Sequence, residues 1–181
     1  MVELRKELEK NSIIMLVLPS DKYLSVLMGE VAELHKNMSK SQSGLCNGVY
    51  VTLNNPYSSL LKIFDDYGIN GASCFFIDAI SSTVKVKTSA ENCIFTSSPS
   101  ALTELSITIN STCQKLKPEL LVFDSLSTLQ IYLPMNTIVK FSQSLVTKLK
   151  DSNIKAIFPI IKNDDFIKNM SMFINKIIEL G

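Results

Sequence analysis

Short apolar runs alternate along this chain with longer segments in which apolar residues recur every three or four positions. The runs have the length of buried strands, and the longer segments have the period of amphipathic helices. Two consecutive parallel strands need a crossover, which is usually a helix. The alternation therefore predicts an α/β fold, with a mainly parallel sheet and helices on both faces. The strands are expected at residues 12–18, 48–53, 74–80, 93–96, 119–123 and 154–161.

Residues typical of helix ends support the predicted helices. Ser20 or Asp21 can cap a helix that follows the first strand. Pro56 can open a second helix, and Gly68 suits the left-handed residue after its last turn. Further helices are expected at residues 100–117 with a cap at 97–99, from Pro134 onward, and at 164–172 before a last strand within 173–180. Between the elements, residues 40–44 predict a surface loop, and the alternation at 84–87 predicts an exposed hairpin or edge strand.

Length and composition favour one folded domain over residues 1–181. Apolar residues make up 46% of the chain and charged residues 19%, which excludes general disorder. The longest apolar run, Ile13–Leu18, is far shorter than the roughly 20 residues that span a bilayer. The first residues mix acidic and basic side chains and do not have the pattern of a signal peptide. We therefore expect a cytoplasmic protein without a membrane partner.

The charge of the chain argues against a dedicated nucleic-acid binder. Eighteen basic and seventeen acidic residues give a net charge of +1, without a block of like charge. Arg5 is the single arginine, and lysine does not make the planar two-pronged contacts that read guanine and phosphate. Nucleic acid is therefore not an expected partner.

The cysteines and the single histidine offer no catalytic pattern. Cys46, Cys74, Cys93 and Cys113 are 28, 19 and 20 residues apart, which is not the spacing of a zinc site or a redox pair. We expect them to be reduced and buried. His35 lies near the end of a predicted helix and is expected to face solvent.

In open α/β sheets, ligands bind beyond the carboxyl ends of the strands. Asp124 is the clearest candidate there, because it directly follows the apolar run Leu120-Leu121-Val122-Phe123. In phosphate-binding folds such an acid holds a magnesium ion, whereas in many other proteins it caps the next turn. The pattern alone leaves both roles open. The other strand-end candidates are residues 19–22, 54–55, 78, 125–127 and 162–164.

Three strands resemble those of the RecA/KaiC superfamily of ATPases, in particular archaeal KaiC-like proteins. Val122-Phe123-Asp124-Ser125-Leu126-Ser127 resembles the Walker B strand of that family. Gly48-Val49-Tyr50-Val51-Thr52-Leu53 resembles its second strand, and Cys74-Phe75-Phe76-Ile77-Asp78 resembles its third. The order and spacing agree from Ser12 to the end of the chain. The resemblance implies a RecA-like core with the P-loop NTPase fold, which is commonly assembled side by side into rings.

Two departures from the family pattern predict the loss of ATPase activity. The family places the phosphate loop Gly-x-x-x-x-Gly-Lys-Ser/Thr after the first strand, but Pro19-Ser20-Asp21-Lys22-Tyr23-Leu24-Ser25 contains no glycine. The family also has paired glutamates after the second strand, where this chain has Asn54-Asn55. An amide cannot take a proton from the attacking water. The positions expected to be remnants of a nucleotide site are Ser20, Asp21, Lys22, Asn54, Asn55 and Asp124.

The leading functional hypothesis is a non-catalytic RecA/KaiC-like domain that regulates or scaffolds through protein–protein contacts. Its partner would be a second copy of the chain or an active paralogue, and it would use no cofactor and no metal. An alternative hypothesis is a protein that binds ATP and magnesium at a non-standard phosphate site and hydrolyses ATP slowly. A third hypothesis is an accessory factor for single-stranded DNA, as some RecA relatives are, although the neutral charge opposes it.

Overall fold

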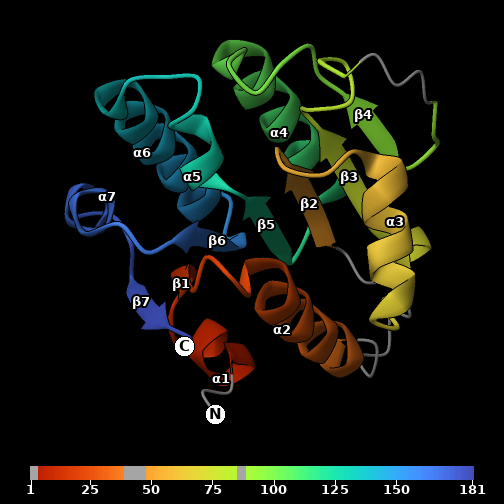
Figure 1. Ribbon diagram of the computed structural model, residues 1–181, viewed down its shortest axis with the longest axis horizontal. Coiled ribbons are helices and arrows are strands. Elements are labelled where there is room, and N and C mark those ends of the chain that lie inside the picture. The colour runs from red at the N-terminus through yellow and green to blue at the C-terminus, as the bar shows by residue number, and fades with distance from the viewer. Residues whose placement is uncertain (1–3, 39–47, 85–88) are drawn as a thin grey trace.

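The computed structural model describes residues 4–38, 48–84 and 89–181 (Figure 1). In these ranges, seven strands form one sheet in the order β4-β3-β2-β5-β6-β1-β7, and every neighbouring pair is parallel. The predicted parallel sheet is confirmed. The strands are β1 (Ile13–Leu18), β2 (Gly48–Thr52), β3 (Cys74–Asp78), β4 (Cys93–Phe95), β5 (Leu120–Asp124), β6 (Lys155–Ile161) and β7 (Lys176–Glu179).

Helices cover both faces of the sheet, as the alternating pattern predicts (Figure 1). One face carries α1 (Leu4–Lys10), α2 (Tyr23–Met38) and α3 (Tyr57–Asp66). The other face carries α4 (Leu102–Leu116), α5 (Leu126–Leu129), α6 (Met135–Asp151) and α7 (Asp164–Met170). A short 3₁₀ turn, η1 (Gly71–Ser73), leads into β3. None of the helices in the described ranges is both long and apolar enough to cross a membrane.

The core consists of two apolar layers, one on each face of the sheet. Successive side chains of a strand point to opposite faces. In β5, Leu121 and Phe123 pack with the α4–α7 layer, whereas Leu120 and Val122 pack with the α1–α3 layer. By the same alternation, Asp124 lies on the face covered by α1, α2 and α3. This placement decides which side chains can reach its carboxylate.

Most predicted elements are confirmed within one to three residues. Pro56 directly precedes α3, and Gly68 has a φ of +68° just after that helix, which a glycine adopts at no steric cost. β6 lies in the interior of the sheet between β5 and β1. The tail forms a helix and then a strand, α7 and β7.

Other predictions need correction. The long helix begins at Leu102 after Ala101, not at residue 100 after a serine cap, because both the amide and the hydroxyl of Ser97 bind the carboxylate of Glu104. The third strand ends at Asp78 instead of residue 80, because the Asp78 carboxylate accepts the amides of Ile80 and Ser81 and turns the chain. Two short helices, α1 and α5, were not predicted. The predictions for residues 40–44, 46 and 85–87 lie outside the described residues.

Candidate functional site

The carboxyl ends of three neighbouring strands are level with one another and carry polar side chains. Thr52 at the end of β2 is in register with Asp124 of β5 on one side and with Asp78 of β3 on the other. All three residues are fully buried. Two acids that the sequence places at strand ends therefore flank β2 at one edge of the sheet.

Both carboxylate oxygens of Asp124 accept hydrogen bonds from uncharged side chains. Oδ1 accepts from the hydroxyl of Tyr23, at 2.6 Å, and from Nδ2 of Asn54, also at 2.6 Å. Oδ2 accepts from the hydroxyl of Tyr50, at 2.7 Å. Tyr23 comes from the first turn of α2, Tyr50 from β2, and Asn54 from the turn between β2 and α3. One carboxylate thus gathers donors from three separate elements.

Burial controls the titration of this group. Burial raises the pKa of Asp124, and the hydrogen bonds from Tyr23, Tyr50 and Asn54 oppose that rise. Burial, followed by the nearby charge of Asp124, raises the pKa of the Tyr23 and Tyr50 hydroxyls well above the ordinary value for tyrosine. Both tyrosines therefore keep their protons at neutral pH and serve Asp124 as donors.

A second set of hydrogen bonds extends the network from Asp124 to α5. Oδ1 of Asn54 accepts a short hydrogen bond from the Thr128 hydroxyl, which fixes the orientation of the Asn54 amide. The Thr128 amide donates to Oγ of Ser125, the residue after Asp124, and the Asp124–Ser125 peptide bond is cis. The turn after β5 is thereby joined to the turn after β2.

The hydrogen bonds of Asp78 stabilise the local fold. Its carboxylate accepts from the amide of Tyr57 at the start of α3, at 2.7 Å, and from the amides of Ile80 and Ser81, both at 2.8 Å. The hydroxyl of Ser81 also donates to it. Asp78 therefore anchors the beginning of α3 to the end of β3.

The structure brings together only part of the predicted set. Asn54 and Asp124 are in direct contact. Ser20, Asp21 and Lys22 are exposed, and within the described ranges the side chains of Ser20 and Asp21 make no hydrogen bond, so the predicted cap of α2 is absent. Asn55 joins the turn only through its backbone, which exchanges two hydrogen bonds with the Thr52 hydroxyl.

Sequence reasoning missed three members of the network, namely Tyr23, Tyr50 and Thr128. Tyr50 is in register with Val122, so it lies on the same face as Asp124, on the neighbouring strand. A tyrosine two residues before the end of a buried strand could have indicated a hydroxyl that reaches the next strand end. The hydrogen bonds of Tyr23 and Thr128 join residues 101 and 74 positions apart, which no local pattern indicates.

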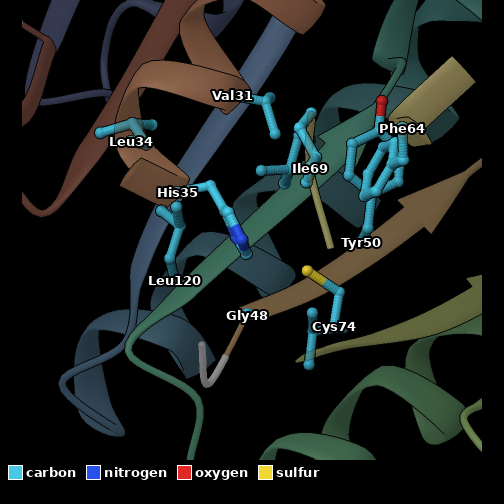
Figure 2. Close-up of a pocket in the computed structure, with 11 residues that line it drawn as sticks. Val31, Leu34, His35, Gly48, Tyr50, Phe64, Ile69, Cys74 and Leu120 are labelled. Carbon is cyan, nitrogen blue, oxygen red and sulfur yellow. The ribbon is translucent and has the colours of Figure 1, made fainter. Parts of the chain in front are cut away.

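A small pocket of about 30 Å³ lies away from Asp124, where β2, β3 and β5 begin (Figure 2). Its lining is apolar apart from the His35 ring and the Cys74 thiol. Tyr50 contributes its ring to the lining, and its hydroxyl points away from His35 (Figure 2). The prediction that His35 faces solvent is wrong. The residue is half-buried, and its Nε2 accepts the amide of Asn70 at 3.4 Å.

Cys93 and Cys113 are free thiols and are buried, as predicted, whereas Cys74 is partly exposed. Burial raises the pKa of Cys93 to about 12 and that of Cys113 to about 11, so both stay protonated thiols at neutral pH. Cys46 lies outside the described residues.

Known proteins resemble this chain in structure and not in sequence. No family model matches it, and no curated protein matches it. Its structure is similar to the crystal structure of a KaiC-like protein from the hyperthermophilic archaeon Pyrococcus horikoshii OT3, with a TM-score of 0.65 and 12% sequence identity. The match covers 94% of this chain and 73% of that protein. The chain therefore has the α/β fold of RecA/KaiC-like proteins, in agreement with the predicted fold class.

Proposed function

We propose that this chain is a non-catalytic KaiC-like domain that acts through contacts with other protein chains, either further copies of itself or an active relative. The observation that carries the proposal is the hydrogen bonding of the Asp124 carboxylate. Both of its oxygens already accept hydrogen bonds from Tyr23, Tyr50 and Asn54. An acid held by three internal donors is a structural element of the fold.

The residues at the carboxyl edge do not fit a magnesium–nucleotide complex. A magnesium ion would have to displace the hydroxyl or amide donors from Asp124, and leaving a buried donor such as the Tyr50 hydroxyl unpaired costs about 1–3 kcal/mol. The turn after β1 has no glycine whose backbone could wrap a phosphate, and Asp21 adds a negative charge there. Asn54 donates to Asp124 and accepts from Thr128, so both the nitrogen and the oxygen of its side-chain amide already have hydrogen-bond partners.

Exposed apolar side chains favour a function based on contact. Ile131, between α5 and α6, is 76% exposed, and Ile107 of α4 is 64% exposed. Ile107 borders an open depression that is also lined by Leu133, just before α6, and by Thr137, in its first turn. Apolar side chains that stay in water cost free energy, which a partner chain can recover by covering them.

The test measures nucleotide binding, turnover and assembly on the same purified chain. With millimolar ATP or ADP and magnesium, we expect no rise in melting temperature and no release of phosphate above the rate without protein. A ligand at about 100 times its Kd would stabilise the native state by about 2.7 kcal/mol, so binding would be visible. Light scattering should give a mass above that of one chain, either alone or after an active relative is added.

Two results would overturn the proposal in different ways. A magnesium-dependent rise in melting temperature that disappears in Asp124→Asn would support an ATP-binding protein instead. Binding of a single-stranded oligonucleotide at low salt, measured by fluorescence anisotropy, would support a DNA accessory factor.

A further inference from the structure

We propose that Asp124 works as a latch that couples three turns of the carboxyl edge, so that a disturbance of one turn reaches the others. The Asp124 latch comprises Tyr23, Tyr50, Asn54, Asp124 and Thr128. It joins the first turn of α2, the turn between β2 and α3, and the turn between β5 and α5. This inference concerns the folded chain without ligand and does not depend on whether the chain hydrolyses ATP.

The first link of the latch is a shared acceptor. Tyr23 and Asn54 both donate to Oδ1 of Asp124, each at 2.6 Å, although they come from different turns. A change in the position of one donor changes how strongly that oxygen binds the other, because hydrogen bonds in a network polarise one another. Tyr23 and Asn54 are therefore coupled through a single oxygen atom.

The second link is the amide of Asn54. Its Nδ2 donates to Asp124, and its Oδ1 accepts from the Thr128 hydroxyl. Rotation of this planar group moves both ends together, so loss of the contact with Asp124 also disturbs the contact with Thr128. Thr128 is tied back to Ser125 through its own amide, which closes the network on the residue after Asp124.

Burial is strongest at the centre of the latch, where Asp124 and Tyr50 lie, whereas Asn54 is exposed. Asp124 is fully buried, and all three of its partners are uncharged donors. When Tyr23 turns away, the buried oxygen of Asp124 is left with one donor fewer in a medium of low dielectric. A partner chain that bound the exposed turn at Ser20–Lys22 and pulled on Tyr23 would loosen the turns at Asn54 and Thr128.

The test uses hydrogen exchange of backbone amides, followed by NMR without nucleotide, in a Tyr23→Phe variant. The substitution removes one hydroxyl and keeps the ring. We expect the amides of Asn55 and Thr128, which donate to Thr52 Oγ1 and to Ser125, to exchange about tenfold faster. The reciprocal variant, Thr128→Ala, should speed exchange at Val26, whose amide lies in the first turn of α2 and donates to the carbonyl of Lys22.

Tyr57→Phe is the matched control. The Tyr57 hydroxyl donates to Asn92 at 2.6 Å, outside the latch, so its removal should leave exchange at Asn55 and Thr128 unchanged. Unchanged exchange at these amides in Tyr23→Phe would overturn the latch. The same conclusion would follow if exchange rose equally at the amide of Ile154, which follows α6 and donates to the Leu149 carbonyl, because the effect would then be global. Since no nucleotide is present, failure here is distinct from failure of the proposed function.

Discussion

Asp124 combines full burial with three uncharged hydrogen-bond donors and no cationic partner among them. Its three donors favour the ionised carboxylate, whereas the loss of water around it favours the protonated form. The loss of water has the larger effect, so its pKa in the folded chain lies above the ordinary value. Because its pKa differs between the folded and unfolded chain, Asp124 makes the free energy of unfolding depend on pH.

The sign of that dependence follows from linkage. A carboxyl whose folded-state pKa is raised binds its proton more readily in the folded chain than in the unfolded chain. Its stabilising contribution is complete below the unfolded pKa of about 3.9 and is lost as the pH rises through the folded value. We expect the Asp124→Asn variant to lose this part of the pH dependence. Urea unfolding of both proteins at several pH values from about 4 to about 7 would measure it. Identical pH profiles for the two proteins would contradict the assignment to Asp124.

On the scale of the elements, the beginning of α3 depends on a side chain from a neighbouring strand. Pro56 precedes the helix and makes no side-chain cap, and Asp78 at the end of β3 accepts the first amide of α3 instead. Asp78→Ala would leave that amide and those of Ile80 and Ser81 without an acceptor. We expect a loss of about 3 kcal/mol in the free energy of unfolding. Asp165→Ala, which removes an exposed acid from the first turn of α7, should cost less than about 1 kcal/mol. Equal losses in the two variants would contradict the anchoring role of Asp78.

The elements that the sequence predicts are those whose pattern repeats over several turns or fills a whole strand. α6 shows its apolar period over 17 residues, whereas α5 has four residues and α1 has seven, too few for a clear period. The start of α4 could not be predicted, because the Ser97 hydroxyl binds Glu104 instead of the first amides. At the candidate site, strand ends predicted Asn54 and Asp124 as candidate residues, and the structure places them in direct contact. The tyrosines were missed because their hydroxyls reach Asp124 across elements distant in sequence.

On the scale of the whole molecule, the strand order distinguishes strands in the interior of the sheet from strands at its edge. β6 lies between β5 and β1, and helices cover both of its faces, whereas β7 pairs with β1 alone. The sequence of β6 is apolar on both faces for this reason, while β7 carries Lys176 and Glu179. Charged residues on a short outer strand discourage pairing with other chains. The middle strands should therefore contribute more to the free energy of unfolding than β7 does.

Two truncations test this distribution. Phe158 in β6 is fully buried, and its ring centroid lies 6.0 Å from that of Phe123. Phe158→Ala should cost about 4 kcal/mol, because it removes a large apolar side chain and leaves a cavity between packed layers. Ile177 in β7 is 36% exposed, so Ile177→Ala should cost about 1 kcal/mol. Because the chain has no tryptophan, urea unfolding followed by circular dichroism is the suitable measurement. A cost for Ile177→Ala as large as that for Phe158→Ala would mean that β7 belongs to the stabilising centre, and the division between interior and edge would not hold.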